Sequence, residues 1–126
     1  MNPKQLIDEA RKIVGIFKLN NADFDAGSVA AALVTADGNL YTGICFDVSC
    51  GIGFCAEHSA ISEMLKHRET KIAKIVAVSK NGCMPPCGRC RELMFQIDKD
   101  NVATKVFLSE EKYVTLDELL PNRWEP

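Results

Sequence analysis

The sequence predicts an α/β fold, a three-layer α/β/α sandwich built around a mixed sheet of about five strands. Segments in which apolar residues recur at helical spacing alternate with short runs rich in β-branched residues. A strong hairpin signal joins the first two predicted strands, whereas predicted helices separate the later ones. We therefore expect an antiparallel hairpin at one side of the sheet and crossover connections elsewhere.

The N-terminal part of the chain predicts a helix followed by the hairpin. Asn2 and Pro3 are typical of an N-cap and a first helical position, and apolar residues continue at helical spacing as far as Phe17. We expect this helix to end at the two asparagines that follow. Residues 28–35 and 40–46 predict strands, because the Ala-Asp-Gly-Asn sequence between them is typical of a hairpin turn.

The rest of the chain alternates loops, helices and strands. In order, the sequence predicts a loop at 47–54, a helix at 55–68, a strand at 72–79, a loop at 81–86, a helix at 86–96, a strand at 102–108 and a short helix at 115–120. No internal repeat, low-complexity tract or linker interrupts this pattern. We therefore expect one domain over residues 1–126.

Composition narrows the class of protein. The chain has 126 residues, 47% of them hydrophobic and 25% charged, with a net charge of −2. A phosphate backbone favours a basic surface, so we expect a small-molecule partner rather than nucleic acid. No apolar stretch reaches the roughly 20 residues that span a bilayer, and the N-terminus is not a signal peptide. Six cysteines without an export signal predict reduced thiols and a cytoplasmic protein.

Three cysteines and one glutamate form the most informative pattern. Cys55 begins a predicted helix and stands two residues before Glu57, while Cys87 and Cys90 share one face at the start of another helix. Helix N-termini favour thiolates, and soft thiolates at this spacing select Zn²⁺. We therefore predict a zinc site made by these three cysteines.

Three thiolates leave a fourth tetrahedral position for water. Zinc can lower the pKa of bound water from about 15.7 toward about 7, which provides hydroxide at neutral pH. Glu57 is then suited to accept the water proton and deliver it to a ring nitrogen and a departing amine. Because three thiolates concentrate negative charge, we expect His58 together with Arg89 or Arg91 to donate to the sulfurs.

The Cys-Ala-Glu and Pro-Cys-Gly-Arg-Cys elements match the pattern of zinc deaminases, in which the glutamate is not a metal ligand. The sequence resembles the cytidine deaminase superfamily, in its small three-cysteine branch, and is similar to blasticidin-S deaminases in its Gly-Arg-Cys-Arg tetrad and its C-terminal tryptophan. The resemblance extends weakly over most of the chain. Its further segments are residues 29–33, 37–38, 41–43 and 118–121.

The resemblance implies a cytidine deaminase-like fold and the hydrolytic deamination of an aminopyrimidine nucleoside or nucleoside-like small molecule. It implies that the backbone N–H of Ala56 holds the ring carbonyl and that the carbonyl of Pro85 faces the leaving amine. It also implies substrate contacts at Ser28 and Asp47. Family members are typically homotetramers, so we expect a homotetramer or a dimer, with Trp124 covering the ring in its own or a neighbouring subunit.

The sugar-binding pattern of cytidine deaminases is altered here. Their Asn-x-Glu pair corresponds to Cys45-Phe46-Asp47, and their substrate-facing phenylalanine corresponds to Gly27. Cytidine, deoxycytidine, blasticidin S and another amino-heterocycle therefore all remain open as substrates. We expect Cys45 and Cys50 to be packing or loop thiols, and Phe46 and Phe54 to belong to the core.

Two other interpretations of the cysteines remain open. Cys83 is close enough in sequence to supply a fourth thiolate, which would make a closed structural zinc site in an interaction module. The Cys87-x-x-Cys90 spacing is also typical of thiol redox proteins. Neither interpretation gives a role to Glu57.

Overall fold

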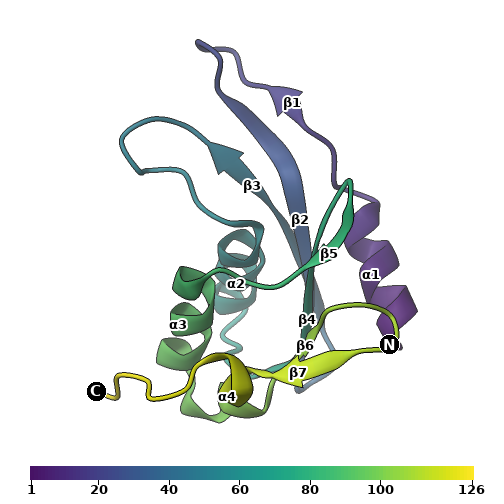
Figure 1. Cartoon of the computed structure of the whole chain (residues 1–126), viewed down its shortest axis with the longest axis vertical. Helices are drawn as coiled ribbons and strands as arrows, with labels where there is room; N and C mark the ends of the chain where they lie inside the picture. The colour runs from purple at the N-terminus through teal and green to yellow at the C-terminus, as the bar shows by residue number, and fades with distance from the viewer.

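A central sheet separates one helix from two others in the computed structural model, which describes residues 1–126 (Figure 1). The helices are α1 (Pro3–Arg11), α2 (Ala56–Lys66), α3 (Gly88–Ile97), α4 (Leu116–Leu119) and the 3-10 turn η1 (Lys99–Ala103). The strands are β1 (Phe17–Lys18), β2 (Asp25–Thr35), β3 (Leu40–Asp47), β4 (Ile72–Ser79), β5 (Gly82–Met84), β6 (Lys105–Phe107) and β7 (Tyr113–Thr115). Helix α1 covers one face and α2 and α3 cover the other, which is the predicted three-layer order.

The sheet is mixed, as predicted, and β2 and β4 form its centre. β2 pairs antiparallel with both β3 and β4, while β4 pairs in parallel with β6. The sheet has seven strands rather than about five. The three unexpected strands, β1, β5 and β7, are two or three residues long, too short to display a period in the sequence.

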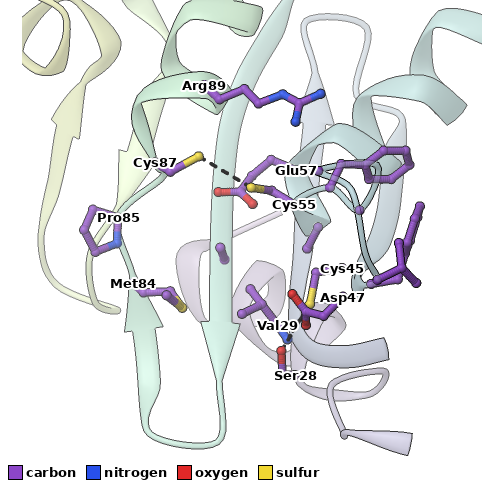
Figure 2. A pocket seen from close by; sticks show the side chains of 17 residues that line it. Ser28, Val29, Cys45, Asp47, Cys55, Glu57, Met84, Pro85, Cys87 and Arg89 are labelled. Atoms are coloured by element: carbon purple, nitrogen blue, oxygen red, sulfur yellow. Dashed lines mark hydrogen bonds between the residues drawn. The ribbon is translucent and has the colours of Figure 1, made fainter. Parts of the chain in front are cut away.

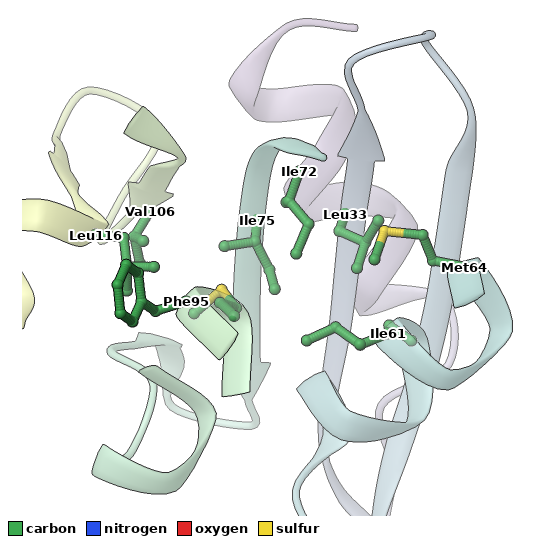
Figure 3. Packing of buried hydrophobic residues seen from close by; sticks show 10 residues of the cluster. Leu33, Ile61, Met64, Ile72, Ile75, Phe95, Val106 and Leu116 are labelled. Carbon is green, nitrogen blue, oxygen red and sulfur yellow. The ribbon is translucent and has the colours of Figure 1, made fainter. Parts of the chain in front are cut away.

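Apolar side chains fill the space on both faces of the sheet. Ala30, Ala32 and Val34 of β2 pack with α1 on one face, whereas Leu33 packs with α2 and α3 on the other. Figure 3 shows this second cluster, in which Ile61 and Met64 of α2 meet the sheet. Because β2 is covered on both sides, its sequence is a continuous apolar run rather than an alternating one.

A glycine allows α2 to lie directly on β3. A Cβ atom at Gly43 would stand 2.5 Å from both the backbone nitrogen of Ala60 and the Cβ of Ser59, closer than atoms can approach. Small residues continue this close contact toward the start of α2, where Ala31 and Ala56 pack together. The N-terminus of α2 is thereby held against the sheet, which places Cys55 and Glu57.

The predicted length of the first helix was wrong. We expected it to reach the asparagines at 20–21, but α1 ends at Arg11 and Phe17 lies in β1, opposite Ala26. Glycine in a helix interior costs about 1 kcal/mol relative to alanine. Gly15 instead donates its N–H to the carbonyl of Gly27 at 2.8 Å, which draws the chain along the edge of β2.

The strand predicted at 102–108 is divided in two. Residues 99–103 form η1, and only Lys105–Phe107 form a strand. The break occurs at Thr104, whose buried hydroxyl donates to the carbonyl of Ile72 at 2.7 Å. Elsewhere the predicted helices and strands agree with the structure to within a few residues at each end. None of the helices is both long and apolar enough to cross a membrane.

Candidate metal centre and active site

Three thiols meet where the N-termini of α2 and α3 converge. The sulfur of Cys55 lies 3.4 Å from that of Cys87, which lies 3.5 Å from that of Cys90. All three sulfurs lie within 4.8 Å of one another. Cys55 and Cys87 are the N-cap residues of their helices, and Cys90 is buried in the first turn of α3.

This arrangement fits a tetrahedral zinc ion. Zn–S bonds of about 2.3 Å at tetrahedral angles place the sulfurs about 3.8 Å apart, close to the separations between these thiols. Both helices direct the positive ends of their dipoles at the cluster, which favours thiolates. Cys83 lies outside the cluster and packs against the residues beneath α1. The donor set is therefore three sulfurs, which leaves one tetrahedral position for a ligand from solvent.

The three thiols differ in their ease of ionisation. Burial raises the pKa of Cys90, and the nearby Glu57 carboxylate raises it further. Burial and the adjacent Cys87 thiol likewise raise the pKa of Cys55. Burial opposes ionisation of Cys87 too, but the N–H groups of Cys90 and Arg89 and the other two thiols outweigh it and lower its pKa. A divalent cation compensates the charge of three neighbouring thiolates, so metal binding releases protons here.

Glu57 projects from the first turn of α2 beside this cluster. Its side chain is only 4% exposed. Burial raises the pKa of its carboxyl group, while its own N–H and the Cys90 thiol lower it by a smaller amount. A raised pKa makes a carboxyl group a better proton acceptor than an ordinary glutamate, which favours the role of general base.

A cavity of about 420 Å³ opens beside the thiols and Glu57. Eight of the residues that the sequence singled out line it: Ser28, Asp47, Cys55, Ala56, Glu57, Pro85, Cys87 and Arg89. In Figure 2, Arg89, Cys87 and Glu57 lie toward one end, and Ser28 and Asp47 lie toward the other. The cavity thus has a metal end made by two helix N-termini and a far end made by strands β2 and β3.

Four other singled-out side chains do not line this cavity: the buried Cys90 of the thiol cluster, and His58, Arg91 and Trp124. The ring of His58 stacks on Phe54 with centroids 5.8 Å apart, and burial together with the charge of Arg89 lowers its pKa. Arg91 donates to backbone carbonyls. Trp124, in the C-terminal tail, is 63% exposed. No hydrogen bond joins His58 or Arg91 to the three thiols: the Nε2 atom of His58 has no partner, and Arg91 bonds only to carbonyls.

We expected Cys45 to be a packing or loop thiol and Phe46 and Phe54 to belong to the core, but all three line the cavity. Cys45 lines it, with its sulfur 3.2 Å from the Ser28 hydroxyl and 3.3 Å from the Val29 nitrogen. Phe54 also lines it and packs against Phe46, with centroids 4.4 Å apart. Strand alternation is a signal that could have found Cys45, because residues 45 and 47 share one face. No local signal distinguishes Phe54 from a core residue.

Comparison with known proteins agrees with this geometry. The family model described as "Cytidine and deoxycytidylate deaminase zinc-binding region" matches residues 6–106, which include all three thiols and Glu57. The chain belongs to this family. A cytidine deaminase of Halalkalibacterium halodurans is 32% identical over 99 residues, 74% of each chain.

Known structures share the fold of this family member. A cytidine deaminase of Mycobacterium tuberculosis superposes with a TM-score of 0.81 at 22% identity, over 100% of this chain and 99% of that one. A cytidine deaminase of Burkholderia pseudomallei gives a TM-score of 0.77 at 28% identity, over 98% of this chain and 100% of that one. The predicted cytidine deaminase-like fold and superfamily are therefore confirmed.

Family and geometry together assign the cofactor and the class of enzyme. The family contains a zinc-binding region, and the Cys55, Cys87 and Cys90 sulfurs are arranged for that metal, so the prediction of Zn²⁺ is confirmed. The chain is a zinc-dependent deaminase, and its family acts on cytidine-type substrates in general. The alternative of a structural zinc module with a fourth thiolate from Cys83 was wrong, because Cys83 lies outside the metal cluster.

Proposed function

We propose that this enzyme hydrolytically deaminates an aminopyrimidine nucleoside, or a nucleoside-like small molecule, and releases ammonia. One observation carries the proposal: the buried carboxylate of Glu57 shares a cavity with two thiols of the three-cysteine cluster, Cys55 and Cys87. Its volume of about 420 Å³ lies within the usual range for small-molecule sites. Zinc, the carboxylate and room for a ring are the requirements of a deaminase that uses water as nucleophile.

Each residue of the metal end has a defined role in this proposal. Cys55, Cys87 and Cys90 would hold zinc, which when bound would lower the pKa of a water molecule and so supply hydroxide as the nucleophile at neutral pH. Glu57 accepts one proton of that water and passes it to the ring nitrogen. It then takes the second proton from the hydroxyl that has been added to the ring carbon and gives it to the amine, which leaves as ammonia while the ring C=O forms. The N–H of Ala56 binds the ring carbonyl, and the carbonyl of Pro85 accepts from the departing amine.

The far end of the cavity recognises the substituent on the ring. Asp47 is exposed there, and its carboxylate oxygens are hydrogen-bond acceptors. The Ser28 hydroxyl lies toward the same end of the cavity (Figure 2) and contacts the Cys45 sulfur. This end therefore favours a hydroxyl-bearing or positively charged substituent over a phosphate, which would meet the charge of Asp47.

The proposal also includes the oligomeric state of the enzyme and its location in the cell. We propose one domain over residues 1–126 that assembles as a homotetramer, or else as a dimer. In that assembly Trp124, exposed in the isolated chain, covers a ring bound in its own or a neighbouring subunit. We propose a cytoplasmic location because the six cysteines are free, and free thiols are typical of a reducing compartment.

A substrate panel tests the proposal. Ammonia release is measured with cytidine, deoxycytidine, cytosine, blasticidin S and aminopurines, each with the zinc-loaded enzyme and with enzyme stripped by a chelator. We expect zinc-dependent turnover of at least one aminopyrimidine nucleoside or blasticidin S. Turnover of aminopurines alone would support the alternative of another amino-heterocycle. Absence of ammonia from every compound would contradict the proposed substrate class.

A further inference from the structure

The side chain of Arg91 joins the metal-binding loop to the C-terminal part of the chain. Its Nε donates to the carbonyl of Pro86 at 2.8 Å, and its Nη1 donates to the carbonyl of Leu119 at 3.1 Å. Pro86 immediately precedes the zinc ligand Cys87, and Leu119 is the last residue of α4. One guanidinium group therefore spans two segments that lie far apart in the sequence.

We propose that Arg91 is a positioning residue of the metal centre, which fixes the Cys87 sulfur by tying the loop at residues 85–87 to the C-terminal segment (residues 116–124). Arg91 does not line the cavity, so it acts through the Pro86 carbonyl rather than on the substrate. This role differs from direct donation to the sulfurs.

The loop depends on Arg91 because it has few donors of its own. Pro85 and Pro86 have no backbone N–H, so neither can anchor the loop by donating a hydrogen bond. Arg91 bonds both carbonyls around the ligand position. Its side chain binds the carbonyl of Pro86, and its backbone N–H binds that of Cys87 at 3.0 Å. The backbone on each side of the Cα of Cys87 is thus held by the same residue.

The C-terminal segment is itself firmly held, so it can serve as an anchor. Leu116 is fully buried in the cluster beneath α2 and α3. Arg123 lies over the ring of Phe95, 5.2 Å from its centroid, and its Nη2 contacts Asp117 at 2.7 Å. Phe95 follows Arg91 by four residues and therefore lies on the same face of α3. Two contacts from one face of α3 thus hold the segment.

The geometry requires arginine rather than a positive charge alone. A planar guanidinium directs its N–H groups at fixed angles and can reach two carbonyls that lie in different directions. The ammonium group of lysine is a point charge on a flexible stem, so it cannot hold both carbonyls in the same way. Replacement by lysine should therefore keep part of the effect, and replacement by methionine should keep none.

The decisive experiment measures zinc release from the full chain. Wild type, Arg91→Lys and Arg91→Met are loaded with zinc and mixed with a chromogenic chelator, and the release rate is recorded. Loss of residues that orient metal ligands typically weakens metal binding about 10- to 100-fold. We expect release from Arg91→Met to accelerate by about this factor, with Arg91→Lys between it and wild type.

A matched control separates positioning from general stability. Ile7→Ala removes a fully buried side chain beneath α1, on the opposite face of the sheet from the metal centre. It should lower the melting temperature and leave the zinc-release rate unchanged. The proposal is overturned if Arg91→Met releases zinc at the wild-type rate. It is equally overturned if release accelerates in Ile7→Ala as much as in an Arg91 variant of similar melting temperature.

A measurement on the unaltered protein keeps the inference testable even if the variants do not fold. The Nε proton of Arg91 should exchange slowly with solvent in ¹⁵N NMR spectra, because it is bonded to Pro86. Exchange as rapid as that of an exposed arginine would contradict the proposal. The inference rests on the zinc site, but neither readout needs a substrate. Its failure is therefore distinguishable from failure of the proposed deamination.

Discussion

Two buried polar side chains on the same side of the sheet, Asn101 and Glu57, differ in how far their polar atoms are hydrogen-bonded. Asn101, 1% exposed, uses all of its polar atoms: it accepts from the Ile72 N–H at 2.8 Å and donates to the carbonyls of Thr70 and Met94 at 3.0 and 2.9 Å. Glu57, 4% exposed, faces a cavity beside the thiols. The free-energy cost of removing the Asn101 amide from water is offset by its three hydrogen bonds. At Glu57 that cost is not fully offset, and it raises the pKa of the carboxyl group.

Helix α3 connects these two regions. Its N-cap residue and its first turn each carry one zinc ligand, and the Met94 carbonyl further along the helix accepts from Asn101. The difference teaches that a fully bonded polar group serves stability, while a buried polar group directed into a cavity is available for chemistry. Changes near Asn101 should therefore affect folding more than turnover, and changes at Glu57 should do the reverse.

Removing the proton carrier should give the largest effect on activity. Positioned general acid–base groups contribute about 10²- to 10⁴-fold to rate, so Glu57→Gln should lower kcat by about that factor. Zinc content and the far-UV circular dichroism spectrum should stay unchanged, because Glu57 is not a ligand. Glu63→Gln, on the more exposed side of the same helix, is the matched control and should keep full activity. An active Glu57→Gln enzyme would refute the role assigned to this carboxylate.

Removing the structural amide should give the next largest effect, this time on stability. Asn101→Ala leaves the Ile72 N–H and two carbonyls without partners, so the free energy of unfolding should fall by about 3 kcal/mol. Turnover per folded, zinc-loaded molecule should be retained. Urea denaturation gives the first quantity and ammonia release the second.

The control for that experiment is an asparagine outside any such network. Asn81 is exposed in the turn between β4 and β5, so Asn81→Ala should change the free energy of unfolding by less than about 0.5 kcal/mol. If Asn101→Ala lowered the free energy of unfolding no more than Asn81→Ala, the hydrogen bonds of Asn101 would not stabilise the fold, and its proposed contrast with Glu57 would be wrong.

The smallest expected effect is on the pH dependence of stability, through the hydrogen bond between Tyr41 and Glu69. Tyr41 donates to the Glu69 carboxylate at 2.6 Å, and this bond, with burial and the carboxylate charge, raises the pKa of Tyr41 to about 12. A raised folded-state pKa means that the contribution to stability is fully present below pH 10.0, the ordinary pKa of tyrosine, and is lost as the pH rises through about 12.

Tyrosinate absorbance measures this pKa directly. The chain has two tyrosines, so a Tyr113→Phe background leaves Tyr41 as the only one that titrates. We expect a midpoint near 12 and, after Glu69→Gln, a midpoint closer to 10.0. Circular dichroism on the same samples identifies the pH range in which the fold persists. An equal midpoint in both proteins would show that Glu69 does not control Tyr41.

The sequence predicted the parts of the structure whose signals are local. The hairpin, β4, α2 and α3 follow from runs long enough to show a period, and Cys55, Glu57, Cys87 and Cys90 follow from spacing within two short motifs. The first helix was predicted too long, because strand pairing of Phe17 with β2 outweighed a helical period that continued past Arg11. β1, β5 and β7 were missed because they exist only through their partners.

The sequence by itself determined the chemistry of this protein: three thiols, one carboxylate and two helix starts. Tertiary structure alone decided the shape of the cavity, in which Cys45 and Phe54 are lining residues, and the contact of Arg91 with Leu119. The physical reason is the separation along the sequence of the residues that must interact. Helix starts and ligand spacing depend on neighbours within a few residues, whereas a cavity wall depends on strands and loops that meet only after the chain has folded.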